Sequence, residues 1–149
     1  MTESTQTSGE TTRAVQLLHT VLSAGVATLG LVCVMVLWRR GSPFLPPENA
    51  VTPWIRYGSL LASLAVLGVA MTVLRPRVPA RSRDQSSDDY WAAVAPRTAA
   101  LVLWVVCHGA AIIALTGYLL TGWLPTLAGA LLSAAALFAY RASTLTTAA

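Results

Sequence analysis

The chain has 149 residues, of which 55% are hydrophobic and only 11% are charged, and its formal net charge is +4. Its charged residues leave three uncharged stretches, 14–38, 57–74 and 98–140, which together hold 86 of the 149 residues. A helix that crosses a bilayer needs about 20 apolar residues. A soluble domain, a disordered chain or a nucleic-acid-binding chain carries charges along its whole length. The composition therefore excludes those classes and predicts an integral membrane protein.

The uncharged stretches predict four membrane-spanning helices, at about 14–38, 54–74, 97–120 and 123–140. The longest stretch is about twice the length of one span, and glycine and proline within 121–125 favour a tight turn there. Backbone groups in hydrocarbon must bond to one another, and the alternating pattern of barrel strands is missing. We therefore expect an all-α protein whose four helices form two antiparallel hairpins, as a single transmembrane domain over 14–140.

The segments before and between the first spans have distinct predicted roles. Residues 1–13 are mostly small and polar, which predicts a disordered N-terminal segment. The first span is too long for a secretory signal and no cleavage site follows it, so we expect it to remain in the mature protein. The loop 41–53 carries four prolines and is expected to be stiff, holding the first two spans as antiparallel neighbours.

The segment 75–96 is predicted to lie at the membrane surface and to contain a short helix. It begins with four arginines and then becomes acidic. Ser87 or Asp88 is a candidate cap for that helix, and Pro96 is placed to open the third span. Residues 141–149 are expected to form a short C-terminal tail.

The distribution of arginine predicts the orientation. All ten basic residues are arginine, which hints at a bacterial source. Seven of them lie in the segments that share a side with both termini, and three lie on the other side. Because positively charged segments stay in the cytoplasm, we expect a multi-pass protein of the inner membrane with both termini cytoplasmic.

The uncharged stretches contain two candidates for a cofactor-binding role, His19 and His108. Proton relays, ion-coupled transporters and voltage sensors use charged groups inside the membrane, so the lack of such groups disfavours these functions. A histidine in a span is usually a neutral side chain bonded to a nearby carbonyl or hydroxyl. The alternative is that one of them ligates a haem or pigment. Joint ligation of one haem is disfavoured because their predicted depths differ by about 7 Å.

No other pattern indicates catalysis or metal binding. Cys33 and Cys107 form no CxxC motif, and Cys107 points about 100° away from its neighbour His108 on a helix. A glycine-rich phosphate loop, a nucleophile elbow and a paired-carboxylate site are all missing. We therefore predict that the chain is not an enzyme, and we expect neither a metal site nor a cofactor.

Small residues at helical spacing are the strongest remaining signal. Membrane helices associate by close backbone packing, which small side chains permit. The candidate packing positions are Ser23, Ala27, Gly30, Gly58, Ala62, Gly109, Gly117, Gly129 and Ser133. These faces predict an accessory or structural subunit that contacts the lipid bilayer and packs against itself or other membrane subunits, with no nucleic acid bound.

One fragment carries a resemblance to known proteins. The sequence His108-Gly109-Ala110-Ala111, together with residues 115–122, resembles the third helix of small uncharacterised four-helix bacterial membrane proteins. In outline the chain is also similar to the tandem-hairpin proteolipids of rotary ATPases. That resemblance implies a proteolipid-like or small-channel role as a further alternative. Proteolipids carry their ion on an intramembrane carboxylate, which this sequence lacks.

Overall fold

The structure, a computed structural model, describes residues 3–146, with side chains from residue 9 onward, and this part of the chain contains no strand. Its helices are α1 (Glu3–Arg40), α2 (Thr52–Val69), α3 (Ser87–Ala92), α4 (Val94–Thr121), α5 (Leu124–Ala139) and α6 (Ala142–Leu145). A π turn at Ala70–Leu74 and a 3-10 turn at Arg75–Arg77 continue α2.

Three helical segments are long and apolar enough to cross a membrane: Gly9–Arg40, Thr52–Arg77 and Val94–Thr121. The fourth apolar helix, α5, has 16 residues. The prediction of an all-helical chain is thus confirmed for the described residues, and three of its helices have the length and composition to cross a membrane.

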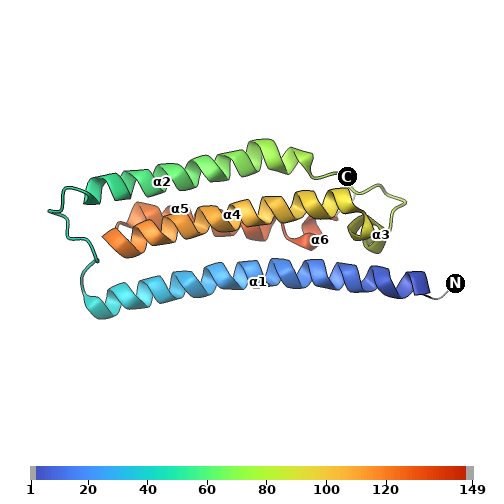
Figure 1. Cartoon of the computed structure of the whole chain (residues 1–149), viewed down its shortest axis with the longest axis horizontal. Coiled ribbons are helices and arrows are strands. Elements are labelled where there is room, and N and C mark those ends of the chain that lie inside the picture. The colour runs from blue at the N-terminus through green and yellow to red at the C-terminus, as the bar shows by residue number, and fades with distance from the viewer. Residues whose placement is uncertain (1–2, 147–149) are drawn as a thin grey trace.

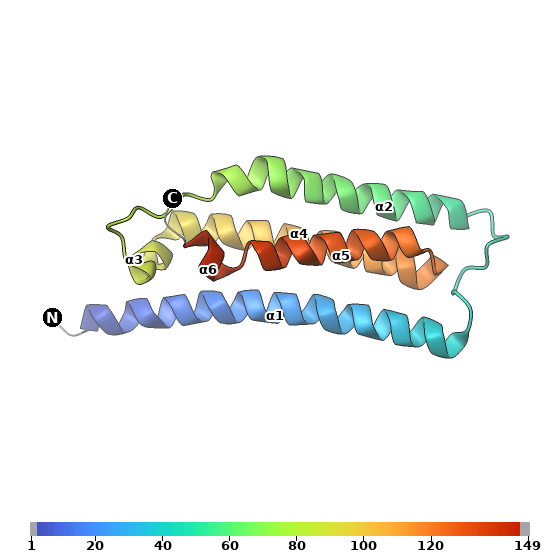
Figure 2. The ribbon, with the colours of Figure 1, turned by 180° about the vertical axis from the view of Figure 1, so that it is seen from behind.

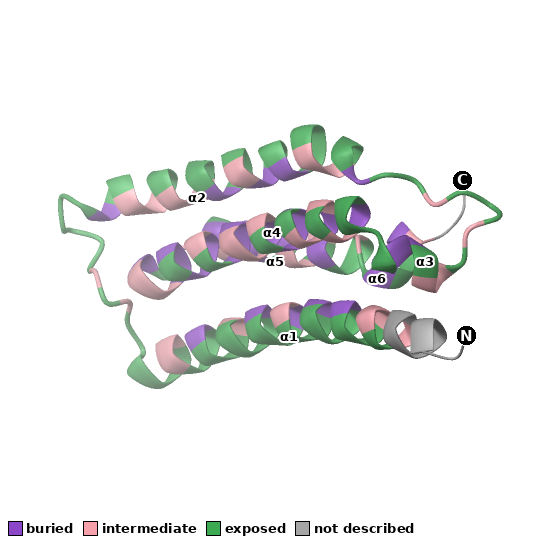
Figure 3. Ribbon diagram, turned by 45° about the vertical axis from the view of Figure 1, so that its right-hand side comes forward, coloured by how far each residue is buried: buried purple, intermediate pink, exposed green. Residues whose placement is uncertain are grey.

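The long helices lie side by side, with α4 at the centre (Figures 1 and 2). Helix α4 packs against α1, α2 and α5. In the most apolar window of α4, 44% of the residues are buried, compared with 17% in each of the two other long segments. In Figure 3, α1 and α2 accordingly show long exposed faces. Because these faces are apolar, they suit contact with lipid.

The predicted pairing of the first two spans is wrong. Helices α1 and α2 make no extensive contact in the described chain, and they lie on opposite sides of the α4–α5 pair. The reason is the course of the proline-rich loop, which crosses the end of that pair instead of turning back on itself. Within it, the backbone N–H of Leu45 donates to the carbonyl of Leu120 at 2.8 Å.

The turn between α4 and α5 lies where the sequence predicts it. Helix α4 ends at Thr121, and Gly122 takes a left-handed conformation with φ +62°, while its N–H donates to the carbonyl of Tyr118 at 2.7 Å. Glycine adopts this conformation without steric cost. Pro125 then lies in the first turn of α5, where its missing N–H is not needed.

The N-terminal segment differs from its prediction. Helix α1 begins at Glu3, so residues 3–13 are helical, not disordered; residues 1 and 2 lie outside the described chain. Extending an existing helix costs far less than starting one. The extension also packs on α3, and the Thr12 hydroxyl donates to a carboxylate oxygen of Asp88 at 2.6 Å.

The predicted short helix before the third span is present as α3. Its cap is one residue earlier than expected, because the Ser86 hydroxyl oxygen accepts from the backbone N–H of Asp89 at 3.0 Å. In the predicted C-terminal tail, α6 buries Ala142 and Leu145, and residues 147–149 lie outside the described chain.

Candidate functional site

His19 is a residue of α1, and its side chain packs against the C-terminal end of α5 instead of facing an open site. Its ring is buried, and its Nε2 atom is 2.9 Å from the carbonyl oxygen of Leu137. A carbonyl oxygen only accepts hydrogen bonds, so Nε2 is the donor in this contact. The ring also meets the indole of Trp104 edge to face, with 4.9 Å between the ring centroids. His19 therefore fastens α1 to both α4 and α5.

The backbone carbonyls at the C-terminal end of α5 need hydrogen-bond donors from other helices. The last four carbonyls of a helix have no partner within it. The N–H of Arg141 bonds to Phe138, not to Leu137, so His19 is a donor for the Leu137 carbonyl. The Trp104 indole N–H donates to the carbonyl of Tyr140 at 2.6 Å. Two side chains from other helices thus cap α5.

The length of α5 gives this cap its importance. Sixteen residues extend about 24 Å, whereas the hydrocarbon core of a bilayer is about 30 Å thick. A helix of this length is shorter than that core, and a carbonyl left unpaired in an apolar environment costs several kcal/mol. His19 and Trp104 remove that cost, which accounts for a histidine and a tryptophan at positions where apolar residues are the rule.

His108 has a separate role. Its Nδ1 atom is 3.1 Å from the carbonyl oxygen of Leu22 on α1, so this ring joins α4 to α1. His108 lies one helical turn beyond Trp104, the residue that meets His19. The two histidines therefore bond to carbonyls on different helices. Each lies beside a backbone carbonyl, the environment described above as usual for a histidine in a span.

Aromatic side chains of α3 continue the cluster. The rings of Trp91 and Trp104 are 6.1 Å apart, and Tyr90 packs edge to face on Trp91. The Tyr90 hydroxyl donates to the carbonyl of Pro79 at 2.8 Å. Burial raises the pKa of Tyr90, and the positive charge of Arg75 lowers it to a smaller extent. The sequence places Trp91 near a span end and Trp104 within one, but it does not reveal that they meet.

The predicted packing residues divide into two sets. The buried set lies in helix contacts or beside a groove, and the other set is exposed or half-buried. The buried residues are Ser23, Gly117, Gly129 and Ser133. The others are Ala27, Gly30, Gly58, Ala62 and Gly109.

The tightest contact of the buried set is between α2 and α4. A β-carbon added to Gly117 would lie 2.6 Å from the β-carbon of Ser59, far inside contact distance. In the same interface, the Ser63 hydroxyl donates to the carbonyl of Ala110 at 2.9 Å. Gly129 brings α5 close to both neighbours, because an added β-carbon there would be 3.2 Å from Leu60. Small residues thus hold α2, α4 and α5 together.

Helix α1 is different, because its small residues line a groove. This α1–α5 groove has a volume of about 460 Å³. Small residues of both helices line it: Ser23, Ala27 and Gly30 on α1, and Ala130 and Ala134 on α5. Ser23 is only 6% exposed, and its hydroxyl has no hydrogen-bond partner in the described structure. The groove therefore has an apolar lining, and the Ser23 hydroxyl is buried within its α1 wall.

The thiols and the acidic groups form no cluster in the described structure. Cys33 and Cys107 are separate, buried free thiols. Among the residues that the structure describes, no three His, Cys, Asp or Glu side chains gather in a way that could hold a metal ion.

We expect the two histidines to contribute unequally to stability. His19→Ala should lower the free energy of unfolding by about 1–3 kcal/mol, because it leaves a buried carbonyl without a donor. His108→Ala should cost less than about 1 kcal/mol, since Leu22 lies within a helix and its carbonyl keeps its backbone partner. Unfolding in detergent micelles titrated with sodium dodecyl sulfate measures both. Equal losses would contradict the capping role of His19.

The comparisons with known proteins add no family. No protein-family model matches the chain, and no match to it was found among curated proteins or solved structures.

Proposed function

We propose that the chain is a non-catalytic, four-span protein of a bacterial inner membrane, with α5 as its fourth crossing and both termini in the cytoplasm. Two features support this topology. Helix α5 is apolar and returns antiparallel to α4, and its early end is capped by His19 and Trp104. The start of α1, helix α3 and helix α6 lie at one end of the molecule (Figure 1). That end carries most of the arginines, as a cytoplasmic side does.

Within the membrane, we propose that the chain acts as an accessory subunit that receives a helix of another membrane protein subunit. The α1–α5 groove is the observation that carries this proposal. Its small residues allow a close approach of another backbone. Leu31, Leu131 and Phe138 line the groove and are largely exposed, so apolar contact area is available to a partner.

Small residues on both walls favour a protein helix over a lipid tail as the occupant, because a helix gains close backbone packing there. Ser23 lies ten residues after Arg13, or about 15 Å along α1, which places the groove near the middle of the bilayer.

Filling the groove tests this function. Ala27 is exposed and lines the groove, so Ala27→Leu should occupy its space without disturbing the bundle. The wild-type protein, extracted into native lipid nanodiscs, should form a particle that contains more than one membrane protein chain. Ala27→Leu should reduce the share of such particles about tenfold, the effect of losing roughly 1.4 kcal/mol of association free energy. Mass photometry measures the distribution.

The matched control is Ala62→Leu, which adds the same side chain to an exposed position on α2. It should leave the particle distribution unchanged. A wild-type protein that is strictly monomeric in nanodiscs would overturn the proposal, and so would an equal effect of the two substitutions.

A further inference from the structure

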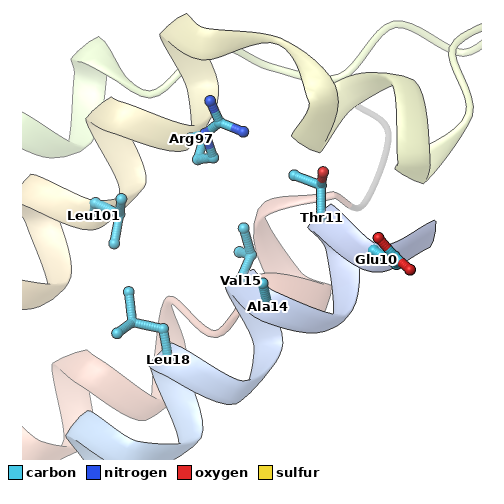
Figure 4. Close-up of a pocket in the computed structure, with 7 residues that line it drawn as sticks. All are labelled: Glu10, Thr11, Ala14, Val15, Leu18, Arg97 and Leu101. Atoms are coloured by element: carbon cyan, nitrogen blue, oxygen red, sulfur yellow. The ribbon is translucent and has the colours of Figure 1, made fainter. Parts of the chain in front are cut away.

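A second groove lies between α1 and α4, at the end of the molecule that carries α3 and α6 (Figure 4). We call it the Arg97 groove. Its volume is about 540 Å³, and its lining includes Glu10, Ala14, Val15 and Leu18 from α1 and Arg97 and Leu101 from α4. It is distinct from the α1–α5 groove, because the two share no lining residue.

Charge and apolar surface are separated along the Arg97 groove. Arg97 and Glu10 lie on different walls at its outer end, and Leu18 and Leu101 lie at the inner end (Figure 4). Within the described chain, neither Arg97 nor Glu10 makes a hydrogen bond or ion pair with another side chain. The mouth of the groove thus presents one positive and one negative group that are both available to a ligand.

The position of the mouth matches the surface of a bilayer. Arg97 immediately precedes the uncharged stretch of α4, and Arg13 immediately precedes that of α1. Arginine at the start of a span lies at the level of the lipid head groups. From Glu10 to Leu18, α1 rises about 12 Å, so the inner end of the groove reaches into the hydrocarbon. The groove therefore follows the length of a lipid, from head group to acyl chain.

We propose that the Arg97 groove binds one phosphatidylethanolamine molecule. The phosphate receives charge-assisted hydrogen bonds from Arg97. The ammonium group of the lipid lies against the carboxylate of Glu10. One acyl chain packs along Val15, Leu18 and Leu101. The proposal depends on insertion into a membrane and not on the accessory-subunit function, so either can fail without the other.

The charges around the mouth select this head group. An anionic lipid would gain the contact with Arg97 but would face the negative charge of Glu10. The nearby carboxylate of Asp88 accepts a hydrogen bond from Thr12, and Arg13 is exposed and lines a different pocket together with Gln16 and Thr20. Among zwitterionic lipids, only an ethanolamine head group has N–H donors for a carboxylate. A choline group has none.

The test uses the full chain, freed of lipid in detergent, with native mass spectrometry to count bound lipid. The probes are palmitoyl-oleoyl phosphatidylethanolamine, phosphatidylcholine and phosphatidylglycerol. We expect one saturable site that prefers phosphatidylethanolamine. Arg97→Gln should weaken its binding about tenfold, the loss of one charge-assisted hydrogen bond. Glu10→Gln should weaken it about two- to fivefold, as for an exposed ion pair, and should not weaken phosphatidylglycerol binding.

Two further variants separate a site from general surface charge. Arg13→Gln removes the same charge from a neighbouring exposed position and should leave binding unchanged. Ala14→Trp fills the groove from an exposed position, where folding tolerates it, and should abolish the saturable site. Circular dichroism checks that each variant is folded. The proposal is overturned if Arg13→Gln acts as strongly as Arg97→Gln, if folded Ala14→Trp still binds, or if phosphatidylglycerol binds better than phosphatidylethanolamine.

Discussion

Replacing Trp104 with alanine is expected to lower the free energy of unfolding by about 3–5 kcal/mol, the usual cost of truncating a buried tryptophan. Trp104 is fully buried and packs against both His19 and Trp91. Its loss also leaves the carbonyl of Tyr140 without its indole donor, which adds a desolvation cost. The measurement is reversible unfolding in mixed micelles, followed by far-ultraviolet circular dichroism.

Two control substitutions identify the source of this loss. Trp54→Ala removes a tryptophan that is 80% exposed, and it should change the unfolding free energy by less than about 1 kcal/mol. Trp104→Phe retains much of the apolar volume but lacks the N–H, so its effect should fall between the other two. If Trp104→Ala were no more destabilising than Trp54→Ala, the result would contradict the burial of Trp104 in the core of the protein.

Gly117→Ala is expected to destabilise the protein by about 1–3 kcal/mol, as overpacking of a tight contact does. The added methyl group would meet the Ser59 side chain, whose hydroxyl also bonds to the carbonyl of Ile55 at 2.6 Å. The clash must outweigh the gain of about 1 kcal/mol that alanine brings to a helix interior relative to glycine. The same micelle titration gives the sign and the size of the change.

Gly58→Ala is the matched control, because nothing lies within 4 Å of a β-carbon added there. It should be neutral or stabilising, opposite in sign to Gly117→Ala. The double variant Ser59→Gly/Gly117→Ala should recover part of the loss, since residues in direct contact show coupled effects. A Gly117→Ala protein as stable as the wild type would show that α2 and α4 are not closely packed at this point.

The helices could be predicted well from the absence of charge. The span expected at 54–74 lies within the helical segment Thr52–Arg77, and the span expected at 97–120 lies within α4. Gly122 and Pro125 also locate the turn, because each has a backbone requirement that can be recognised without any tertiary contact. Local physical constraints of this kind can be read directly from a single sequence.

The arrangement of the helices and the capping cluster could not be predicted in this way. The order of the helices depends on which small faces meet, as Gly117 meets Ser59, and many alanines offer the same spacing. The partners of His19 and Trp104 are 118 and 36 residues away along the chain. An isolated histidine in a span therefore indicated only that some carbonyl or ligand lies nearby.

The separation of α1 from α2 has a consequence for biosynthesis. A ribosome completes both of these helices before it makes the α4–α5 pair that stands between them. Until residue 121 has been added, α2 lacks a complete α4, on which it mainly packs, and until residue 139 has been added, α1 has no complete α5 to cap. The first two helices are therefore made without lasting contact to each other, and α4 and α5 must come to lie between them. They gain their lasting neighbours only once α4 and α5 have been made.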